Sequence, residues 1–283
     1  MGDIVERRDT PTMAVPSRSA MMRAIGGLGR MVWTQWDEAR HAAAVIGTAF
    51  CLSLQPRHWA RTVRNMFARE ILAIGVEPLA IVCGLAVLVG IMVVAELAFW
   101  TGEAGQSQLL GPLLVAIVAR ELGPALMNIV VIVRSGSVMA TELGIMKIGG
   151  RIHVLEAQGI DPFTYLVMPR VLAAALSTFC LTVVFILVAF ASGFLFGALI
   201  GKESPDGLLF LNTVSNAVHP TDVLNVVAKS VLPALFASAT CCIAGLGVGG
   251  SVIEVPPVTQ RALVRSIAGV FVISAAVSLL TYL

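Results

Sequence analysis

Five long apolar stretches constrain the fold of this chain more than any other feature of its sequence. They occupy residues 71–100, 109–133, 165–200, 223–250 and 262–283. Each is long enough to cross the hydrocarbon core of a bilayer, which takes about 20 apolar residues in a helix. A backbone surrounded by lipid must satisfy its own polar groups, so continuous stretches of this kind cross as helices. The sequence therefore predicts an all-α integral membrane protein with five transmembrane helices.

The composition excludes a soluble globular protein, because 57% of the 283 residues are hydrophobic and only 13% are charged. The polar remainder is too short to form a large soluble domain. All five cysteines lie in apolar surroundings, without the paired spacing of a metal site or a disulfide framework. Their positions favour buried thiols that serve only in packing.

The first 70 residues carry a different pattern, which predicts segments outside the bilayer core. Residues 1–20 combine mixed charge with prolines, which is typical of a disordered tail. Residues 21–40 have the helical period of an amphipathic helix lying in the headgroup layer. The apolar run 42–54 is too short to cross a bilayer, and it is followed by a basic, amphipathic turn. We therefore predict a cytoplasmic tail over 1–20 and interfacial or elbow helices over 21–70.

The distribution of basic residues predicts how the helices are oriented. Sixteen lysines and arginines lie in the intervals 1–70, 134–170 and 251–265. The intervals 101–108 and 201–222, at the opposite ends of the apolar stretches, contain only Lys202. Cytoplasmic loops carry such an excess of Lys and Arg. We therefore expect the N-terminus in the cytoplasm and, with five spans, the C-terminus on the periplasmic side.

Charged residues inside the second apolar stretch need a physical reason. Arg120 and Glu121 lie near its middle, where each charge costs about 2.5–3.5 kcal/mol on insertion scales. Adjacent helical residues point about 100° apart, so each is expected to have a partner on another helix or to face a wet cavity. A buried clamp between helices and a direct contact with substrate both remain open. Glu96 and Lys229 are further charges in apolar stretches, and together they are candidates for a polar outer mouth.

The polar interval after the second stretch predicts a short helix between two spans. Gly149 and Gly150 divide it, and residues 151–158 make about two helical turns. Gly159 is placed to terminate this helix, while Asp161 before Pro162 is placed to start the next one. A short, partly apolar helix in such a position is expected to dock on a partner, although an ordinary interfacial loop is the alternative. A Gly193-x-x-x-Gly197 pattern also permits close helix contact.

The sequence contains none of the motifs that would make this chain an enzyme in its own right. No stretch matches the phosphate-binding pattern GxxxxGK[ST], and no metalloprotease or nucleophile-elbow motif occurs. We therefore expect no cofactor on this chain. If the protein is driven by ATP, a separate subunit must bind the ATP and Mg²⁺.

Several ordered motifs closely resemble the MlaE/YrbE family of ABC-transporter permeases. They are Arg120-Glu121-Leu122-Gly123-Pro124, Arg134-Ser135-Gly136-Ser137, Thr141-Glu142-Leu143-Gly144-Ile145-Met146-Lys147, Gly159-Ile160-Asp161-Pro162 and Pro169-Arg170. The resemblance is strongest over 111–170 and weaker over about 45–283. It identifies 71–283 as a permease domain of this type.

The resemblance implies a permease of the bacterial inner membrane that acts as a homodimer with two cytoplasmic ABC ATPase subunits and a periplasmic MCE-domain protein. It implies movement of phospholipid or a similar lipid between the inner membrane and the periplasmic partner or outer membrane, with no nucleic acid involved. Its lipid cavity would use Glu96, Leu97, Arg120 and Glu121. Its ATPase-coupling helix would fall on 146–159. The coupling residues would be Met146, Lys147, Arg151, Ile152, Leu155 and Glu156.

This chain departs from the family pattern in three places. Many members have acidic or amide residues where Gly149, Gly150 and Arg151 stand, and a Gln close to the position of Glu96. Residues 254–261 replace the usual Thr-rich run before the last span. Two other classes of function are considered beside the ABC permease, namely an ion-coupled secondary transporter and a non-transporting membrane scaffold. The chain lacks the paired inverted halves that are common among secondary transporters.

Overall fold

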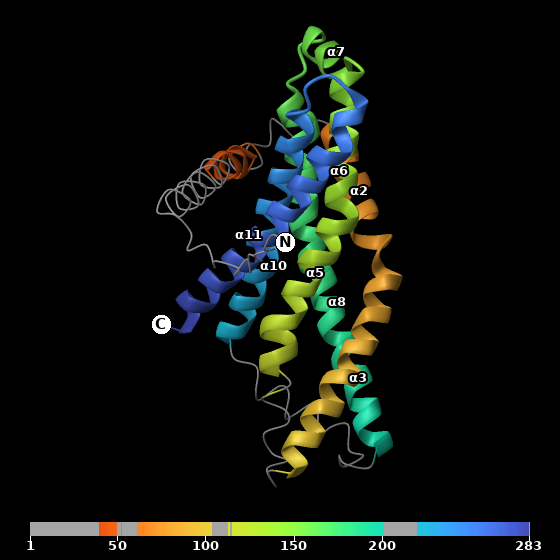
Figure 1. The fold of residues 1–283 in the computed structure, drawn as a ribbon, viewed down its shortest axis with the longest axis vertical. Coiled ribbons are helices and arrows are strands. Elements are labelled where there is room, and N and C mark those ends of the chain that lie inside the picture. Colours follow the sequence, from red (N-terminus) through yellow and green to blue (C-terminus); the bar gives the residue numbers. More distant parts are fainter. Residues whose placement is uncertain are drawn as a thin grey trace, which may run out of the picture. The chain divides into compact units, whose positions relative to one another are not determined.

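The structure is a computed structural model that describes residues 40–49, 52, 61–103, 113, 115–200 and 220–282. Contacts divide the chain into two units, Met1–His41 and Ala42–Leu283, and the elements below belong to the second unit (Figure 1). All regular elements in the described residues are helical. Five helices are long and apolar enough to cross a membrane, which confirms the predicted fold class: Arg61–Leu97, Val115–Ile148, Phe163–Leu199, Pro220–Leu246 and Val252–Thr281.

The predicted tail over 1–20 and all but the last residue of the amphipathic helix predicted over 21–40 lie outside the described residues. Residues 40–49, which include most of the short apolar run, are helical. The proposed boundary between elbow helices and permease domain at residue 70 stays a prediction. In the structure, α2 (Arg61–Ile71) continues through a π-helical turn, η2 (Leu72–Val76), toward α3 (Leu79–Glu103).

Three of the four π-helical segments in the described residues end two positions before a proline. These segments are η2, η4 (Val115–Leu122) and η6 (Phe163–Val167), which precede Pro78, Pro124 and Pro169; the fourth is η5 (Ile132–Gly136). A proline has no N–H, and its ring crowds the carbonyl four residues earlier. A wider turn relieves this crowding, as in the bond from Glu77 N to Leu72 O at 3.2 Å, five residues back.

The remaining helices complete the spans. The second span consists of η4, α5 (Gly123–Val131), η5 and α6 (Ser137–Ile148), and it leads into α7 (Arg151–Ala157). The third span is η6 with α8 (Met168–Ile200), the fourth is α10 (Pro220–Leu246), and the fifth is η7 (Val252–Glu254) with α11 (Val255–Tyr282).

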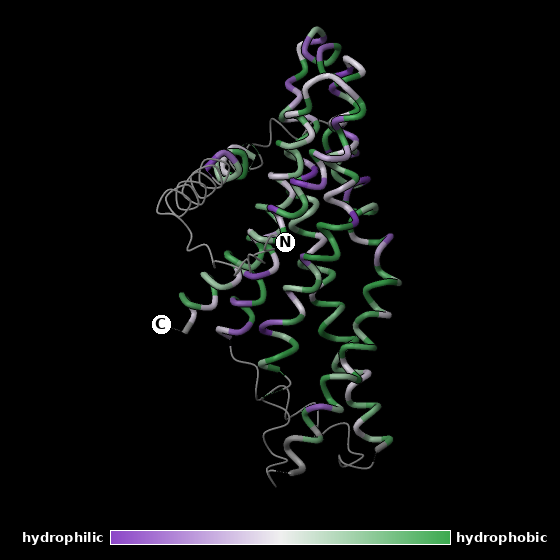
Figure 2. The backbone as a smooth tube through the Cα atoms, in the orientation of Figure 1, coloured by the Kyte–Doolittle hydropathy of each residue, from purple (hydrophilic) through white to green (hydrophobic). Residues whose placement is uncertain are grey.

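Two helices organise the packing of these spans. α8 packs against α2, α3, α5 and α10, while α10 packs against α5, α6, α8 and α11. The buried core between α8 and the first and second spans contains Val82, Val118, Met127 and Phe185, each fully or almost fully buried. Hydrophobic residues dominate α3 and α8, whereas hydrophilic residues gather around α7 (Figure 2). We refer to that part of the bundle as the α7 end.

The turns on both sides of α7 agree with the sequence prediction. Gly150 and Gly159 have φ values of 70° and 74°, in the left-handed region that glycine adopts most easily. Gly159 N donates to Glu156 O at 2.9 Å and Ile160 N donates to Leu155 O at 3.0 Å, which is a Schellman motif. Asp161 then accepts from the backbone N–H groups of residues 163 and 164, both at 3.2 Å, and so caps the third span.

The glycine pattern of α8 serves contact between helices of the same chain. A Cβ atom at Gly193 would lie 2.6 Å from Val94 Cγ2 of α3, and one at Gly90 would lie 2.3 Å from the Ala189 carbonyl oxygen. Both distances are too short for real atoms. α3 and α8 approach closely only because these positions have no side chain.

We predict that Gly90→Ala destabilises the protein by about 1–3 kcal/mol, since the new methyl group overlaps backbone atoms that cannot rotate away. Gly84→Ala is the matched control on the same helix, because a Cβ atom there would have nothing within 4 Å. Thermal denaturation of the purified protein in detergent measures both. An unchanged melting temperature for Gly90→Ala would contradict the close packing of α3 on α8.

Candidate functional site

The two charged residues in the middle of the second span both have partners on α10. Arg120 Nη2 donates to Asp222 Oδ2 at 2.9 Å, and Arg120 Nε lies 2.8 Å from Asp222 Oδ1. Lys229 Nζ lies 2.5 Å from Glu121 Oε1. Asp222 and Lys229 are seven residues apart and therefore share one face of α10. The expectation that Arg120 and Glu121 need partners on another helix is confirmed.

The same two helices also satisfy carbonyl groups that prolines leave without their usual donor. Pro124 has no N–H for the Arg120 carbonyl, and Lys229 Nζ donates to that oxygen at 3.2 Å. In return, Pro233 has no N–H for the Lys229 carbonyl, and Asn128 Nδ2 donates to that oxygen at 3.0 Å. The two spans thus exchange donors across their contact. An unsatisfied carbonyl in an apolar environment costs several kcal/mol, so the exchange matters for stability.

Burial differs sharply between the two ends of the Lys229–Glu121 pair. The Lys229 side chain is 1% exposed, whereas the Glu121 side chain is 54% exposed and also accepts from Ser278 Oγ of α11 at 3.3 Å. Burial of Lys229 differs from the prediction that it lines an outer mouth with Glu96. These contacts favour the clamp between helices over a direct substrate role for Arg120, while the exposed face of Glu121 is open to further contacts.

The other two predicted cavity residues lie on α3. Leu97 is 7% exposed and belongs to the buried core that α3 forms with α8. Glu96 is exposed. The structure thus brings Arg120 and Glu121 together with α10, and it places Leu97 in the packing core.

Sequence reasoning missed Asp222 and Asn128 as members of this site. A signal for Asp222 was present, because it lies two helical turns before Lys229, which was already recognised as a possible counter-charge. Asn128 carried a weaker signal. Its role depends on Pro233 of another span, and no spacing within the second span reveals that pairing.

We predict that Arg120→Asp and Asp222→Arg each lower the melting temperature, and that the charge-swapped double variant recovers part of the loss. Partners in direct contact show coupling free energies of about 0.5–3 kcal/mol in such a cycle. A mismatched pair, Arg134→Asp with Asp222→Arg, is the control and is not expected to recover stability. Strictly additive losses in the swapped variant would contradict the clamp.

The residues predicted for ATPase coupling divide into two groups in the structure. Met146 and Leu155 are partly buried against a core cluster that includes Leu143 and Leu166. Lys147 Nζ donates to the Leu246 carbonyl at 2.5 Å and so caps the C-terminal end of α10. These three residues therefore hold α7 and its neighbours to the bundle.

The outward group consists of exposed residues on and beside α7. Glu156 is exposed and lies 3.3 Å from His153 Nδ1, while Arg151 is exposed and Ile152 is half-buried. Val154 is 57% exposed and Ile160 is 40% exposed, although sequence reasoning selected neither. The helix has no buried residue. Its outer surface is therefore a mixture of apolar and charged side chains.

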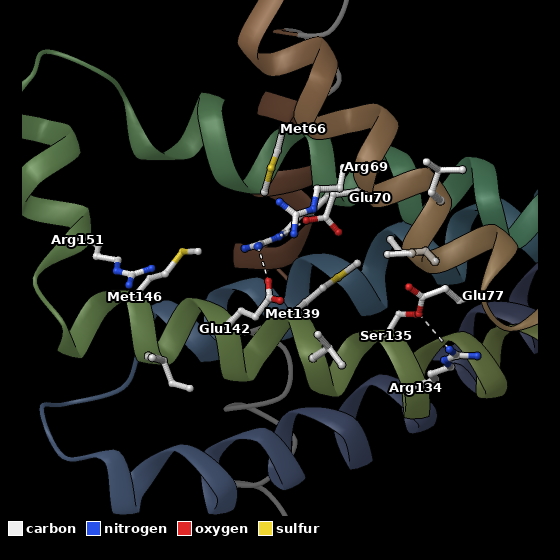
Figure 3. Close-up of a pocket in the computed structure, with 16 residues that line it drawn as sticks. Met66, Arg69, Glu70, Glu77, Arg134, Ser135, Met139, Glu142, Met146 and Arg151 are labelled. Carbon is white, nitrogen blue, oxygen red and sulfur yellow. Dashed lines mark hydrogen bonds and ion pairs between the residues drawn. The ribbon is translucent and has the colours of Figure 1, made fainter.

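A cavity of about 650 Å³ lies between the first span and the α7 end of the second span (Figure 3). Arg170 of α8 lines it and bridges both spans, with Nε 2.9 Å from Glu70 Oε1 and Nη2 2.6 Å from Glu142 Oε2. A second ion pair, Arg134 Nη2 to Glu77 Oε2 at 3.1 Å, lies farther along the same cavity. Glu142 and Arg170 lie within motifs of the family resemblance, but no role was predicted for either from the sequence.

The fold and these polar contacts define a multi-pass helical membrane protein with charged clamps between its spans. A family model described as "Permease MlaE" matches residues 67–280. The chain therefore belongs to the MlaE permease family.

Individual relatives agree with this assignment. A probable ABC transporter permease protein of Synechocystis is 30% identical over 70% of this chain and 75% of its own length. The protein TRIGALACTOSYLDIACYLGLYCEROL 1, chloroplastic, of Arabidopsis thaliana is 28% identical over 76% of this chain. The match spans 59% of that protein, which is less than two thirds of its length. The intermembrane phospholipid transport system permease protein MlaE of Haemophilus influenzae is 27% identical over 59% of this chain and 63% of its own length.

Proposed function

We propose that this chain is the permease subunit of an ATP-driven ABC transporter that moves phospholipid or a similar lipid. Family membership supports the proposal, and so do the names of relatives, which include ABC transporter permeases and a phospholipid transport permease. The permease acts as a homodimer with two ATPase subunits, which bind the ATP and Mg²⁺, and with a periplasmic MCE-domain protein. It lies in the inner membrane and exchanges lipid with that partner or the outer membrane.

The observation that carries the proposal is the exposed surface of α7. Leu155 holds α7 to the bundle, whereas Val154 and Glu156 on its outer face are exposed, and this combination of an apolar and a charged side chain at a bundle end suits docking on a partner. The excess of Lys and Arg in the same interval supports a cytoplasmic position for it, with the N-terminus also cytoplasmic and the C-terminus periplasmic. A cytoplasmic ATPase subunit is the partner that this position fits.

The path from α7 into the membrane follows one helical segment. Val115–Ile148 runs from the clamp at Arg120 to the start of the α7 turn. Movement of α7 on ATP binding is therefore transmitted along the second span to η4. The clamp with Asp222 and Lys229 makes α10 follow that movement. Lipid tails lie on apolar helix faces of the dimer, and the exposed carboxylate of Glu121 contacts or gates the polar end of the lipid together with Glu96.

We predict that Val154→Asp and Glu156→Arg each lower lipid-stimulated ATP hydrolysis of the assembled complex by about tenfold or more, as for loss of an interface residue worth about 1.4 kcal/mol or more. Both side chains are exposed, so the melting temperature of the isolated permease is expected to stay the same. Leu155→Asp is the contrasting variant. It places a charge against a core cluster and is expected to lower the melting temperature itself.

Wild-type ATP hydrolysis in both Val154→Asp and Glu156→Arg complexes would show that α7 is not the coupling element. The permease assignment would then need another docking surface.

We also predict that the full-length chain, purified under mild conditions from cells that express its neighbouring genes, carries a stoichiometric protein with Walker motifs. Mass spectrometry of the same preparation is expected to find bound phospholipid. Consistent absence of the ATPase would favour the scaffold. If the ATPase is absent and lipid uptake is driven by protons, the secondary transporter would be favoured.

A further inference from the structure

The cavity beside Arg170 lies at the α7 end of the long apolar helices, where a span is expected to leave the hydrocarbon core and enter the headgroup layer. Its walls come from residues 66–77 of the first span and 134–146 of the second, together with Arg151 of α7 and Arg170 of α8, on the α7 side of the long apolar part of α3. Its edge is apolar and open, with Leu72 59% exposed and Val138 52% exposed. A cavity of about 650 Å³ falls within the usual range for ligand sites. A charged interior beside an apolar edge suits an amphiphile.

The arginines that line the cavity have more hydrogen-bond donors than the carboxylates in its lining occupy. Four arginines line it, at positions 69, 134, 151 and 170. In the part of the chain that the structure describes, Arg69 and Arg151 have no ion pair. The Arg170 side chain is only 1% exposed, and its buried Nη1 atom has no hydrogen-bond partner among those residues. A buried guanidinium N–H without an acceptor is costly, and an anionic oxygen would remove that cost.

The net charge of the lining indicates which anion fits. Glu70, Glu77 and Glu142 oppose the four arginines, which leaves one net positive charge. One excess charge matches the single negative charge of a phosphodiester. A multiply charged free phosphate or nucleotide would leave unbalanced negative charge beside the three carboxylates, which the single excess positive charge cannot neutralise.

We propose that this cavity binds the phosphodiester headgroup of a phospholipid from the leaflet at the α7 end, with Arg69 and Arg170 as donors. The tails of the lipid then lie along Leu72, Val76 and Val138, which are all more than half exposed. The proposal rests on the proposed function, to which it adds a headgroup site at a depth distinct from Arg120 and Glu121. Because Met146 and Arg151 also line this cavity, occupancy is sensed next to the α7 turn.

The test uses the full-length permease in nanodiscs made of a phosphorus-free glycolipid, into which phosphatidylglycerol is titrated. A photoreactive amino acid replaces Val138 at the cavity edge, and the yield of lipid crosslink gives the half-saturating mole fraction. Arg69→Gln is the test variant and Arg64→Gln the matched control. Both arginines are exposed on α2, but only Arg69 lines the cavity.

We expect Arg69→Gln to raise the half-saturating mole fraction about tenfold, as for loss of one charge-assisted hydrogen bond. Arg64→Gln is expected to change it less than twofold, and millimolar inorganic phosphate is not expected to displace the lipid. Equal values for the two variants would overturn the headgroup site. Complete displacement by inorganic phosphate would instead indicate a site for free anions and would also overturn it.

The same nanodiscs, supplied with the ATPase subunit, separate this inference from the proposed function. If lipid transfer depends on ATP but crosslinking does not depend on Arg69, the headgroup site alone is overturned. Saturable crosslinking that depends on Arg69, without any ATP-dependent transfer, would support the headgroup site and refute the transporter.

Discussion

The contact between the second span and α10 depends on a reciprocal exchange of hydrogen-bond donors. Pro124 and Pro233 each remove a donor from the carbonyl four residues earlier, and side chains from the opposite helix replace both donors. Lys229 is central, because its Nζ atom satisfies one freed carbonyl and its own carbonyl is the other. In lipid, no water is present to take over either role. Each helix break is therefore tolerated only while the other helix stays in place, which makes the two spans one mechanical unit.

A second constraint acts nearer the α7 end, where one guanidinium joins three spans. Arg170 is on α8, and its partners Glu70 and Glu142 are on the first and second spans. Removal of Arg170 would leave Glu70 and Glu142 without the guanidinium that pairs with both of them. The first span has little direct packing on the second, since it packs mainly against α8. This ion-pair bridge therefore determines how closely the two walls of the cavity approach.

Much of this architecture was predictable from local sequence patterns, while the partners of the charged residues were not. Five spans follow from apolar length, and the α7 turns follow from Gly150, Gly159 and Asp161, since each of these features acts within a few residues. The continuity of α2 with the first span was missed, because the charged surface of α2 looks like that of a separate elbow helix. Asn128 was missed because its acceptor is the Lys229 carbonyl, 101 residues away, which lacks its usual donor only because Pro233 follows it in α10. Leu155 was predicted as a coupling residue, and its packing on the bundle was not foreseen, because apolar character on a short helix does not reveal which side faces the bundle.

The order of features along the second span explains how a signal at one end can reach the other. Starting from the α7 turn, the chain passes the cavity wall at Glu142 and Arg134 and then the clamp at Arg120. Packed helices move as rigid elements with discrete arrangements, so a displacement at α7 is not absorbed locally. The π-helical turns η4 and η5 are the exceptions, because their wider geometry allows a change of register. η5 lies beside the cavity and η4 contains the clamp. Both places where the span can yield thus carry charged residues, Arg120 and Glu121 in η4 and Arg134 in η5.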